Sequence, residues 1–461
     1  MNLLDTLRDA VGAAQVLTDG DLSSWELDWR KRYRGRALAV VRPANTAQVA
    51  AVVRACAAHR TGVVAQGGNT GLVGASVPDN SGTQVLLSLS RLNRIRQIDA
   101  ANLTITVEAG CILQAVQEAA AAQGLLFALS LAAEGSCTLG GNLATNAGGT
   151  QVLRYGNARD LCLGLEVVTA TGEVWDGLSG LRKDNTGYSL RDLFIGSEGT
   201  LGIITRVVLR LHPQPGCTMA ALCALPDFDA VKRLLGAARR GLGPQLSAFE
   251  VMWPDYWQLV TQRIGVRAPV QSGHGHYVLV EAQGTDAAVD APRFERWLEQ
   301  LLNDGVLADA ALAQSIADIQ SFWALRDACA EFVATIGPHI SYDVGLAVRD
   351  MDAFAARCKA ALALSIPGCD SVYYGHIGDG NLHLVAWVPG LGVQAQPKHE
   401  MDEAVYGTVR DFKGSISAEH GIGTTKKAYL GHARSEAEIA LMRTLKAALD
   451  PSGLLNPGKV I

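Results

Sequence analysis

Three glycine-rich clusters in the first half of the chain constrain its fold most strongly. They are GGNTGLVG at 67–74, GSCTLGGNLATNAGG at 135–149 and GSEGTLGIIT at 196–205. None has the lysine and hydroxyl residue that end a Walker A loop, and none is a G-x-G-x-x-G fingerprint in a clean strand–helix–strand unit. Because glycine lacks a Cβ, its backbone N–H groups can point at a ligand at close range, which suits a pyrophosphate. Each cluster alone could be a tight turn, but the three together predict a large phosphate-bearing cofactor.

The composition agrees with close backbone approach and excludes several classes of protein. Glycine accounts for 49 of the 461 residues and proline for only 15, without a collagen-like period. The 40 Lys and Arg residues are balanced by 45 Asp and Glu residues, so the chain is not a strongly basic nucleic-acid binder. The nine cysteines are odd in number and lack C-x-x-C spacing, which favours free thiols in a reducing compartment.

The N-terminus and the apolar runs indicate where the protein works. Asp5, Arg8 and Asp9 interrupt the stretch that a signal peptide would need to keep apolar. No run reaches the roughly 18 apolar residues of a membrane-spanning helix. We therefore expect a cytoplasmic protein with no transmembrane segment.

Hydrophobic patterning predicts a mixed α+β architecture. Residues 46–59 have helical spacing after Thr46, a candidate N-cap, and residues 321–335 have the periodicity of one helix. The segment 212–216, HPQPG, is a cluster of chain breakers. We therefore place a first domain at 1–212, a second at 213–440 and a C-terminal segment at 441–461.

A pair of histidines in the second half is a candidate metal site. His376 and His383 lie at equal distances from the Asp379-Gly380 centre of a predicted turn, so a hairpin would make their imidazoles neighbours on one face. Two convergent histidines and a carboxylate are typical of a transition-metal site with open positions, and Glu419 in SISAEHGIG is the candidate carboxylate. A purely structural role for the pair is the alternative. His274 and His276 lack an acidic partner at a useful spacing, and we expect them at the surface.

The wording and order of these motifs resemble a known flavoprotein family. The three glycine clusters look like the FAD-binding domain of the vanillyl-alcohol-oxidase/PCMH superfamily. The strings GSCTLGGNLATNAGG, RYGNARDLCLGLEVV and SEGTLGIIT are similar to the branch of D-lactate and D-2-hydroxyglutarate dehydrogenases, and the similarity runs from about Val41 to the closing LNPGKV. The resemblance implies an α+β fold: a PCMH-type FAD-binding domain, and a C-terminal FAD-linked-oxidase domain with an antiparallel sheet for substrate and metal.

The resemblance also implies which residues hold FAD. The backbone of 66–71 would hold the pyrophosphate, a second group would line the flavin, a third the adenine side, and the tail would return to touch the isoalloxazine. These residues are Gly67, Gly68, Asn69, Thr70 and Gly71 for the pyrophosphate; Ser136, Thr138, Gly141, Asn142, Thr145 and Ala147 for the flavin; Glu198, Gly199 and Ile204 for the adenine side; and Asn456 in the tail. Neither Asn69 nor Thr70 is a nucleophile for covalent attachment, and this branch commonly carries an unlinked cysteine where Cys137 stands. We therefore predict non-covalent FAD.

For the chemistry, the resemblance implies a metal, a base and a carboxylate anchor. His376, His383 and Glu419 match the family's ligands to Zn²⁺ or a similar ion, Mn²⁺, Co²⁺ and Fe²⁺ being alternatives. His420 matches the catalytic base, and Arg326 the residue that binds the substrate's α-carboxylate. The implied reaction is oxidation of a D-2-hydroxy acid to the 2-oxo acid: His420 takes the hydroxyl proton and the Cα hydride passes to flavin N5.

Substrate choice is where this sequence departs from the glutarate-specific members. They are expected to carry Thr, Lys and Asn at positions where this chain has Ala330, Ser341 and Val385. All three replacements remove polar contacts that would serve a second carboxylate. We therefore expect a smaller or more apolar monocarboxylate such as D-lactate, with D-2-hydroxyglutarate as the alternative.

Other readings stay open at the level of sequence. A metal hydrolase would leave the glycine loops unexplained, and a non-catalytic flavin subunit of an oxidase complex would not need His420 and Arg326. The electron acceptor is open among an electron-transfer flavoprotein, a quinone and a cytochrome, through which the protein could meet the inner membrane peripherally. The oligomeric state is open, a homodimer included.

Overall fold

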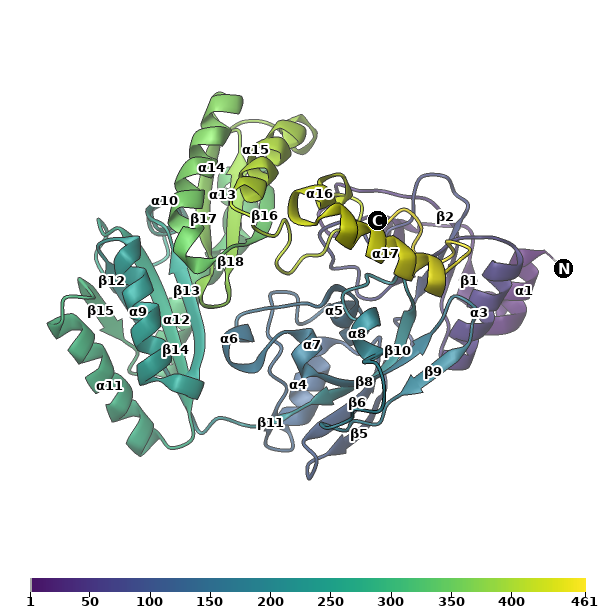
Figure 1. Ribbon diagram of the computed structural model, residues 1–461, viewed down its shortest axis with the longest axis horizontal. Coiled ribbons are helices and arrows are strands. Elements are labelled where there is room, and N and C mark those ends of the chain that lie inside the picture. Colours follow the sequence, from purple (N-terminus) through teal and green to yellow (C-terminus); the bar gives the residue numbers. More distant parts are fainter. Residues whose placement is uncertain (1) are drawn as a thin grey trace. The chain divides into compact units, whose positions relative to one another are not determined.

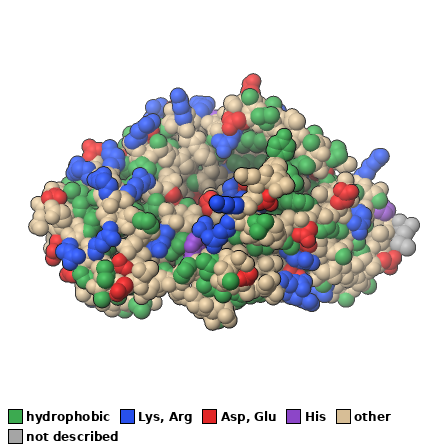
Figure 2. Space-filling model, turned by 60° about the horizontal axis from the view of Figure 1, so that its bottom comes forward, with side chains coloured by type: hydrophobic (Ala, Val, Ile, Leu, Met, Phe, Trp, Pro, Cys, Tyr) green, Lys and Arg blue, Asp and Glu red, His purple; other side chains and the backbone are tan. Residues whose placement is uncertain are grey.

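A computed structural model describes residues 2–461 and divides the chain into two compact units. The first unit comprises Met1–Gly149, Gly156–Gln214 and Glu419–Ile461, and the second Thr150–Tyr155 and Pro215–Ala418. The break at Gln214 falls inside the predicted HPQPG boundary, whereas the chain returns to the first unit at Glu419, before the predicted start of the tail at 441. Within residues 2–461, no helix combines the length and hydropathy needed to cross a bilayer. Figure 2 shows basic and acidic side chains mixed over the face in view.

The first unit begins with a four-stranded sheet in the order β1-β2-β4-β3. Its strands are β1 (Val16–Leu17), β2 (Ala37–Val41), β4 (Gln84–Ser88) and β3 (Val63–Gln66). The pairs β2–β4 and β3–β4 are parallel, and helix α3 (Thr46–Ala58) connects β2 to β3 beside α1 (Leu3–Val11), as Figure 1 shows. Asn45, not Thr46, is the N-cap of α3: its side chain accepts the N–H of Gln48 at 3.0 Å.

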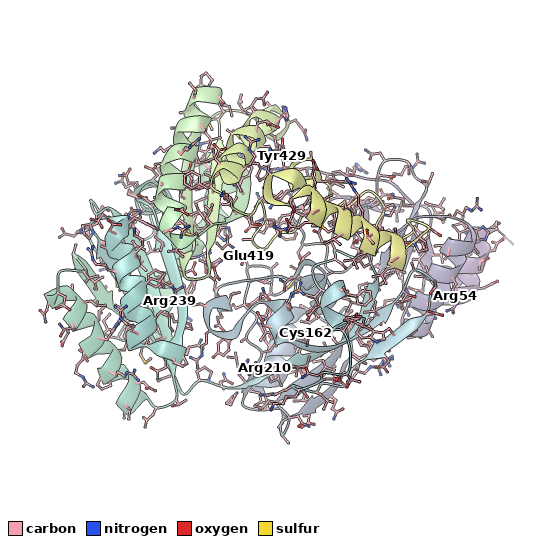
Figure 3. The ribbon with its side chains drawn as sticks, viewed as in Figure 1. Arg54, Cys162, Arg210, Arg239, Glu419 and Tyr429 are labelled. Atoms are coloured by element: carbon pink, nitrogen blue, oxygen red, sulfur yellow. The ribbon has the colours of Figure 1, made fainter. Side chains whose placement is uncertain are left out.

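The first unit also contains a two-stranded sheet, β7 (Leu125–Leu126) with β11 (His212–Pro213), and a five-stranded antiparallel sheet. The order of the larger sheet is β5 (Ile95–Asp99), β6 (Thr104–Glu108), β10 (Ile203–Arg210), β8 (Cys162–Val168) and β9 (Val174–Gly177). Buried Glu166 on β8 joins helix α3 to this sheet, because it accepts hydrogen bonds from Thr46 Oγ1 on α3 at 2.5 Å and from Thr205 Oγ1 on β10 at 2.7 Å. Arg54 on α3, labelled in Figure 3, donates to the carbonyl of Gly172 at 2.7 Å in the turn between β8 and β9. The polar groups at this junction are therefore paired, as burial requires.

The C-terminal segment adds a strand-like stretch to the first sheet. Helix α17 (Glu436–Leu449) begins at a capping box on Ser435 and ends before Asp450. Leu455 then forms a parallel bridge with Val63 on β3. Asp450 is 2% exposed, and its carboxylate accepts the N–H groups of Leu454 and Leu455 at 2.9 and 2.8 Å. One buried carboxylate thus turns the chain from α17 onto the sheet.

The second unit is built on a seven-stranded antiparallel sheet in the order β15-β12-β14-β13-β17-β18-β16. Its strands are β12 (Cys217–Leu225), β13 (Leu246–Met252), β14 (His276–Gly284), β15 (Asp309–Leu312), β16 (Ile340–Gly345), β17 (Asp370–His376) and β18 (Asn381–Trp387). Figure 1 shows α9 (Phe228–Gly241), α11 (Ala287–Asn303) and α14 (Met351–Ser365) in front of these strands. The antiparallel sheet predicted for this half is confirmed.

An aromatic-rich core covers one face of this sheet. Trp257 stacks on Tyr277 with ring centroids 3.7 Å apart, and Tyr256 lies 4.5 Å from Tyr374. The helix predicted over 321–335 is interrupted: α12 (Ile316–Asp327) ends, a 3-10 turn follows, and α13 (Phe332–Ile336) resumes. The Tyr256 hydroxyl donates to the carbonyl of Arg326 at 2.6 Å and lies 3.2 Å from that of Leu325, which satisfies an acceptor at the end of α12.

The prediction that His276 lies at the surface is wrong. Its side chain is buried where Phe228 and Trp253 pack edge-on against the imidazole. Its Nε2 is 3.4 Å from the carboxylate of Asp352, which is 76 positions away in the sequence and therefore absent from any local pattern.

We expect Asp450→Ala to destabilise the first unit, because two buried N–H groups lose their acceptor. The cost is about 2 kcal/mol, which lowers the Tm by roughly 5 °C for a unit of this size. Thermal unfolding followed by circular dichroism measures the shift, and Asp450→Asn, which keeps one acceptor oxygen, should lose less. An unchanged Tm for Asp450→Ala would contradict this account of the tail.

Candidate functional site

The three glycine clusters meet around one cavity, and every residue of its wall belongs to the first unit. The space between atoms inside the cavity and at its mouth, open solvent included, is about 850 Å³. Its wall contains the predicted cofactor residues Gly67, Gly68, Asn69, Thr70, Gly71, Thr138, Gly141, Asn142, Thr145, Glu198, Gly199, Ile204 and Asn456, and also His420. Ser136 and Ala147 are not part of the wall, and their predicted contacts stay predictions.

Glycine is required where the first two clusters pack together. A Cβ on Gly67 would lie 2.3 Å from Thr138 Oγ1, and one on Gly68 would lie 2.1 Å from the carbonyl oxygen of Ser136. A Cβ on Gly71, in contrast, would meet nothing within 4 Å and would project into open space at the cavity wall. The glycines therefore close the loops against one another and keep the cavity open.

Two buried polar atoms in the cavity wall lack a partner among residues 2–461. They are Thr138 Oγ1 and Asn456 Oδ1. Because buried polar groups are nearly always hydrogen-bonded, these atoms point to a ligand that supplies the partners. Cys137 does not line the cavity: its sulfur accepts a hydrogen bond from Asn142 Nδ2 at 3.4 Å, and burial raises the pKa of the thiol.

Glu198 binds the segment that carries His420. Its carboxylate accepts the N–H of Ile422 at 2.7 Å and of Gly423 at 2.9 Å, and its carbonyl accepts Asn456 Nδ2 at 2.5 Å. Burial raises the pKa of Glu198, although both amides act in the opposite direction. The adenine-side contact predicted for Glu198 remains a prediction, and its carboxylate has this second task.

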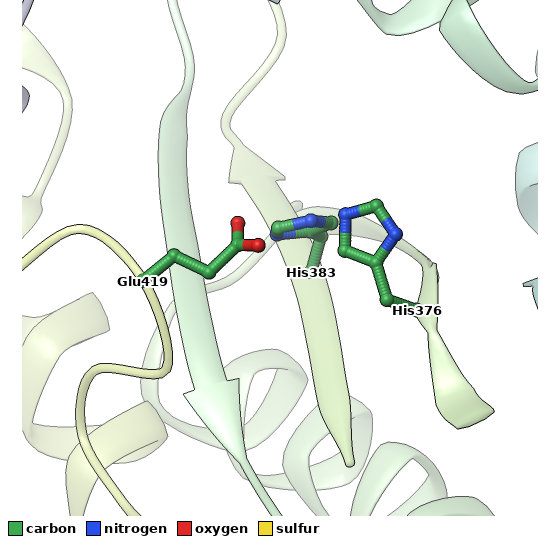
Figure 4. Close-up of side chains that lie close together, drawn as sticks. All are labelled: His376, His383 and Glu419. Carbon is green, nitrogen blue, oxygen red and sulfur yellow. The ribbon is translucent and has the colours of Figure 1, made fainter. Parts of the chain in front are cut away.

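The histidine hairpin lies in the second unit. Figure 4 shows His376 at the end of β17 and His383 on β18, and their ring centroids are 5.1 Å apart. Tyr374, not His376, is directly opposite His383, so the two imidazoles are diagonal neighbours on the same face. Arg239 on α9 (Figure 3) holds the turn between β17 and β18, because its guanidinium donates to the carbonyl of Gly378 at 2.8 Å. A Cβ on Gly378 would lie 2.8 Å from Leu153, so glycine is needed there too.

Arg326 is buried in the last turn of α12, which excludes its being a surface helix arginine. Its Nε donates to Glu250 Oε2 at 2.7 Å, and its Nη2 lies 3.0 Å from His376 Nε2. The guanidinium stands over the ring of Tyr374, 5.3 Å from the centroid. Burial alone would raise the pKa of Glu250, but His376 and Arg326 together lower it to about 2, so the carboxylate is ionised.

Glu419 directly follows Ala418, the last residue of the second unit. The preceding residue, Ala418, donates its N–H to Asp343 Oδ2 at 3.1 Å, and Ser417 Oγ donates to the same oxygen at 3.2 Å. Asp343 is fully buried on β16, directly opposite His383 on β18. The residue before Glu419 is therefore anchored next to the histidine pair. Figure 4 includes the Glu419 side chain.

Sequence reasoning missed three residues that hold the predicted ones in place: Glu250, Asp343 and Arg239. Only Glu250 had a local signal, because it is the single charge in the apolar strand LSAFEVM. Asp343 and Arg239 act through contacts 75 and 139 positions apart, which spacing cannot reveal.

Two family models match this chain over most of its length. The model of FAD linked oxidases, C-terminal domain, covers residues 214–460, and the model of the FAD binding domain covers 37–177. These matches confirm the resemblance and the FAD cofactor expected from the sequence.

Curated relatives match across nearly the whole chain. A D-2-hydroxyglutarate dehydrogenase of Xanthomonas citri pv. viticola is 41% identical over 99% of this chain and 96% of the relative. The mitochondrial D-2-hydroxyglutarate dehydrogenase of Bos taurus is 39% identical over 98% and 82%. A mitochondrial protein of Schizosaccharomyces pombe, whose name carries a provisional D-lactate dehydrogenase assignment, is 37% identical over 99% and 90%.

Solved structures of low sequence identity share the fold. The 4-ethylphenol oxidase from Gulosibacter chungangensis aligns with a TM-score of 0.77 at 19% identity, covering 100% of this chain and 96% of that one. p-Cresol methylhydroxylase aligns with a TM-score of 0.76 at 17% identity, covering 99% and 96%. The predicted α+β fold class is confirmed.

Glu198→Gln tests the hold on the segment after His420. An amide has only one acceptor oxygen, so its NH₂ group would face one of the two N–H donors. We expect amide hydrogen exchange in a peptide covering 420–424 to become about tenfold faster, since a weakened buried hydrogen bond is worth about 1–3 kcal/mol.

Glu173→Gln is the matched control, because Glu173 is an exposed glutamate of the same unit. Exchange in 420–424 that is equally slow in the wild type and Glu198→Gln would show that the carboxylate does not hold this segment.

Proposed function

We propose, because this chain belongs to the FAD-linked oxidases, that it is a flavin- and divalent-metal-dependent dehydrogenase of small D-2-hydroxy monocarboxylic acids. The relatives named above act, by their names, on D-2-hydroxyglutarate or D-lactate. The observation that carries the proposal is the position of His420, which lines the cofactor cavity and directly follows Glu419. A candidate base thus stands at the flavin site, next in sequence to a candidate metal ligand.

FAD fits the cavity of the first unit. The glycine loops offer backbone at close range for a pyrophosphate, and Thr138 Oγ1 and Asn456 Oδ1 offer two unpaired polar atoms for the cofactor. When bound, FAD supplies the acceptor for the hydride on the substrate's Cα. We propose non-covalent FAD, because Cys137 lies outside the wall and the first loop offers no nucleophile.

His376 and His383 of the second unit, together with Glu419, are a donor set that fits a divalent metal. The Nδ1 of His376 is 2.6 Å from Glu250, so this nitrogen carries the proton and the lone pair is on Nε2, where a bound metal would replace the contact with Arg326 Nη2 at 3.0 Å. We propose His376, His383 and Glu419 as the ligands, with Zn²⁺ first and Mn²⁺, Co²⁺ or Fe²⁺ as alternatives. When bound, the metal acts as a Lewis acid that lowers the pKa of the substrate hydroxyl.

His420 and Arg326 are the chain's own groups for the reaction. His420 accepts the hydroxyl proton, since an imidazole has its ordinary pKa near 6.5 and can be neutral at pH 7. Arg326 binds the α-carboxylate through the Nη edge of its guanidinium, because its Nε is bonded to Glu250 and a metal on His376 Nε2 would displace Nη2 from that nitrogen. The substrate is thus oriented by its carboxylate and deprotonated at its hydroxyl by different residues.

The surroundings of the histidine pair favour a monocarboxylate. Val385 lies two residues beyond His383 on the same face of β18 and is 2% exposed, in a core cluster with Tyr374 and Trp387. Ser341 is directly opposite Val385 on β16. Neither Val385 nor Ser341 offers a cation to a second carboxylate.

We expect kcat/KM for D-lactate to equal or exceed that for D-2-hydroxyglutarate, because the apolar wall cannot repay desolvation of the second carboxylate. Steady-state assays with an artificial electron acceptor measure both values. Ala330→Thr/Ser341→Lys/Val385→Asn should shift the ratio by at least about tenfold toward D-2-hydroxyglutarate, as a newly paired polar group does. A wild-type preference of tenfold or more for D-2-hydroxyglutarate would overturn the monocarboxylate proposal and favour the alternative.

His420→Ala should retain FAD and lose substrate oxidation. We expect an unchanged flavin spectrum and a rate of flavin reduction at least about 100-fold lower, since general-base catalysis typically contributes that much. His274→Ala is the control, because His274 belongs to the second unit and lies far from the cavity residues in sequence. Reduction of His420→Ala flavin at the wild-type rate would remove His420 as the base.

A further inference from the structure

Glu250 on β13 is a buried carboxylate to which neither the sequence nor the proposed reaction assigns a task. It is 1% exposed and uses both oxygens: Oε1 lies 2.6 Å from His376 Nδ1, and Oε2 lies 2.7 Å from Arg326 Nε. The contact with His376 follows from register, because Glu250 and His376 are directly opposite on β13 and β17. One side chain thus touches a proposed metal ligand and the proposed carboxylate anchor.

The bond to Nδ1 decides which nitrogen of His376 can bind a metal. A carboxylate accepts a hydrogen bond from Nδ1–H, so the imidazole is held with its lone pair on Nε2. Such outer carboxylates orient metal-binding histidines and make them more basic ligands. Without Glu250, the ring could turn or carry its proton on Nε2, and either change removes the ligand atom.

The bond to Nε decides which edge of Arg326 is available. A guanidinium bound at Nε presents its Nη edge, the edge that makes bidentate contacts with a carboxylate. In this structure Nη2 lies 3.0 Å from His376 Nε2 and Nη1 3.6 Å from Asp327, so a substrate carboxylate would replace these contacts. The ring of Tyr374 supports the guanidinium from one side. The negative charge of Glu250 also offsets the cation, which an apolar core would otherwise not tolerate.

A second buried glutamate shows that burial alone does not create this role. Glu281 on β14 projects from the same sheet face, since it is directly opposite Ala248, two residues from Glu250. It is 6% exposed and accepts from Ser247 Oγ at 2.8 Å and Trp323 Nε1 at 2.9 Å, both neutral groups.

We propose that Glu250 is a positioning residue shared by two parts of the active site: it sets the tautomer of His376 for the metal and the orientation of Arg326 for the substrate carboxylate. This inference rests on the proposed function. It adds that the metal site and the substrate anchor are coupled through one carboxylate.

The test measures zinc affinity without turnover. Purified FAD-containing protein is stripped of metal and titrated with Zn²⁺ against a chromogenic chelator for the wild type, Glu250→Gln and the control Glu281→Gln. We expect Glu250→Gln to bind Zn²⁺ about 10–100-fold more weakly, the usual effect of losing such a partner. Glu281→Gln should match the wild type, and both variants should keep the flavin spectrum.

Two further variants keep the test decisive if Glu250→Gln does not fold. Glu250→Gln/Arg326→Gln removes both buried charges and should show the same loss of zinc affinity as expected for Glu250→Gln. Arg326→Gln alone should keep near wild-type zinc affinity while KM for D-lactate rises at least about tenfold, as for a lost charged contact. Equal zinc affinity in Arg326→Gln and the double variant would overturn the role of Glu250.

The outcomes separate this inference from the proposed function. Equal Zn²⁺ affinities of the wild type and Glu250→Gln would overturn the inference and leave the proposed function standing. Wild-type protein that binds no Zn²⁺, Mn²⁺, Co²⁺ or Fe²⁺ would overturn the metal in the proposed function, and the inference with it.

Discussion

The hydrogen bonds that the Glu198 carboxylate accepts from Ile422 and Gly423 hold the C-terminal segment against the rest of the first unit. Residues of this unit come from both ends of the sequence, so folding must bring back a segment more than 200 positions away. Glu198 holds the backbone of Ile422 and Gly423, Asn456 bonds the Glu198 carbonyl, and Lys459 donates to the carbonyls of Gly74 and Val77 at 2.9 and 2.6 Å. Burial lowers the pKa of Lys459 to about 8. The glycine loops and the returning tail thus form the wall of one cavity, and His420 enters that wall with the tail.

The second unit holds charged groups at one end of a sheet face that is otherwise apolar. One face is apolar at Val385 and Trp387 and polar at the end where the histidines lie. Each histidine has a carboxylate on the strand beyond it: Glu250 opposite His376, and Asp343 opposite His383. Buried charges are tolerated only when paired and hydrogen-bonded. The arrangement therefore concentrates polar chemistry at one end of the face and leaves the other to pack an aromatic core that excludes water.

The sequence predicted the parts whose signal is local. Glycine clusters, the histidine hairpin and the breaker cluster at 212–216 each occupy a few consecutive residues, and the family matches confirm the FAD cofactor and the fold. Long-range register decides the rest. Glu250 gains His376 as a partner because β13 pairs with β17, 126 positions apart, and no window of sequence contains that pairing. The helix predicted over 321–335 ends at Asp327. In its last turn, the carbonyl of Arg326 accepts a hydrogen bond from the hydroxyl of Tyr256, 70 positions away. Asn45, not Thr46, is the N-cap of α3, and the threonine hydroxyl donates instead to Glu166 on β8.

The central claim is that a metal and a flavin act together on one enantiomer of a 2-hydroxy acid. Anaerobic titration of the wild-type flavin with D-lactate and with L-lactate, before metal removal, after it and after Zn²⁺ is restored, tests that claim most directly. The account predicts bleaching of the flavin band by D-lactate alone, slowed at least about 100-fold without metal and recovered with Zn²⁺. Equal bleaching by both enantiomers, or bleaching by D-lactate at full rate after metal removal, would contradict it.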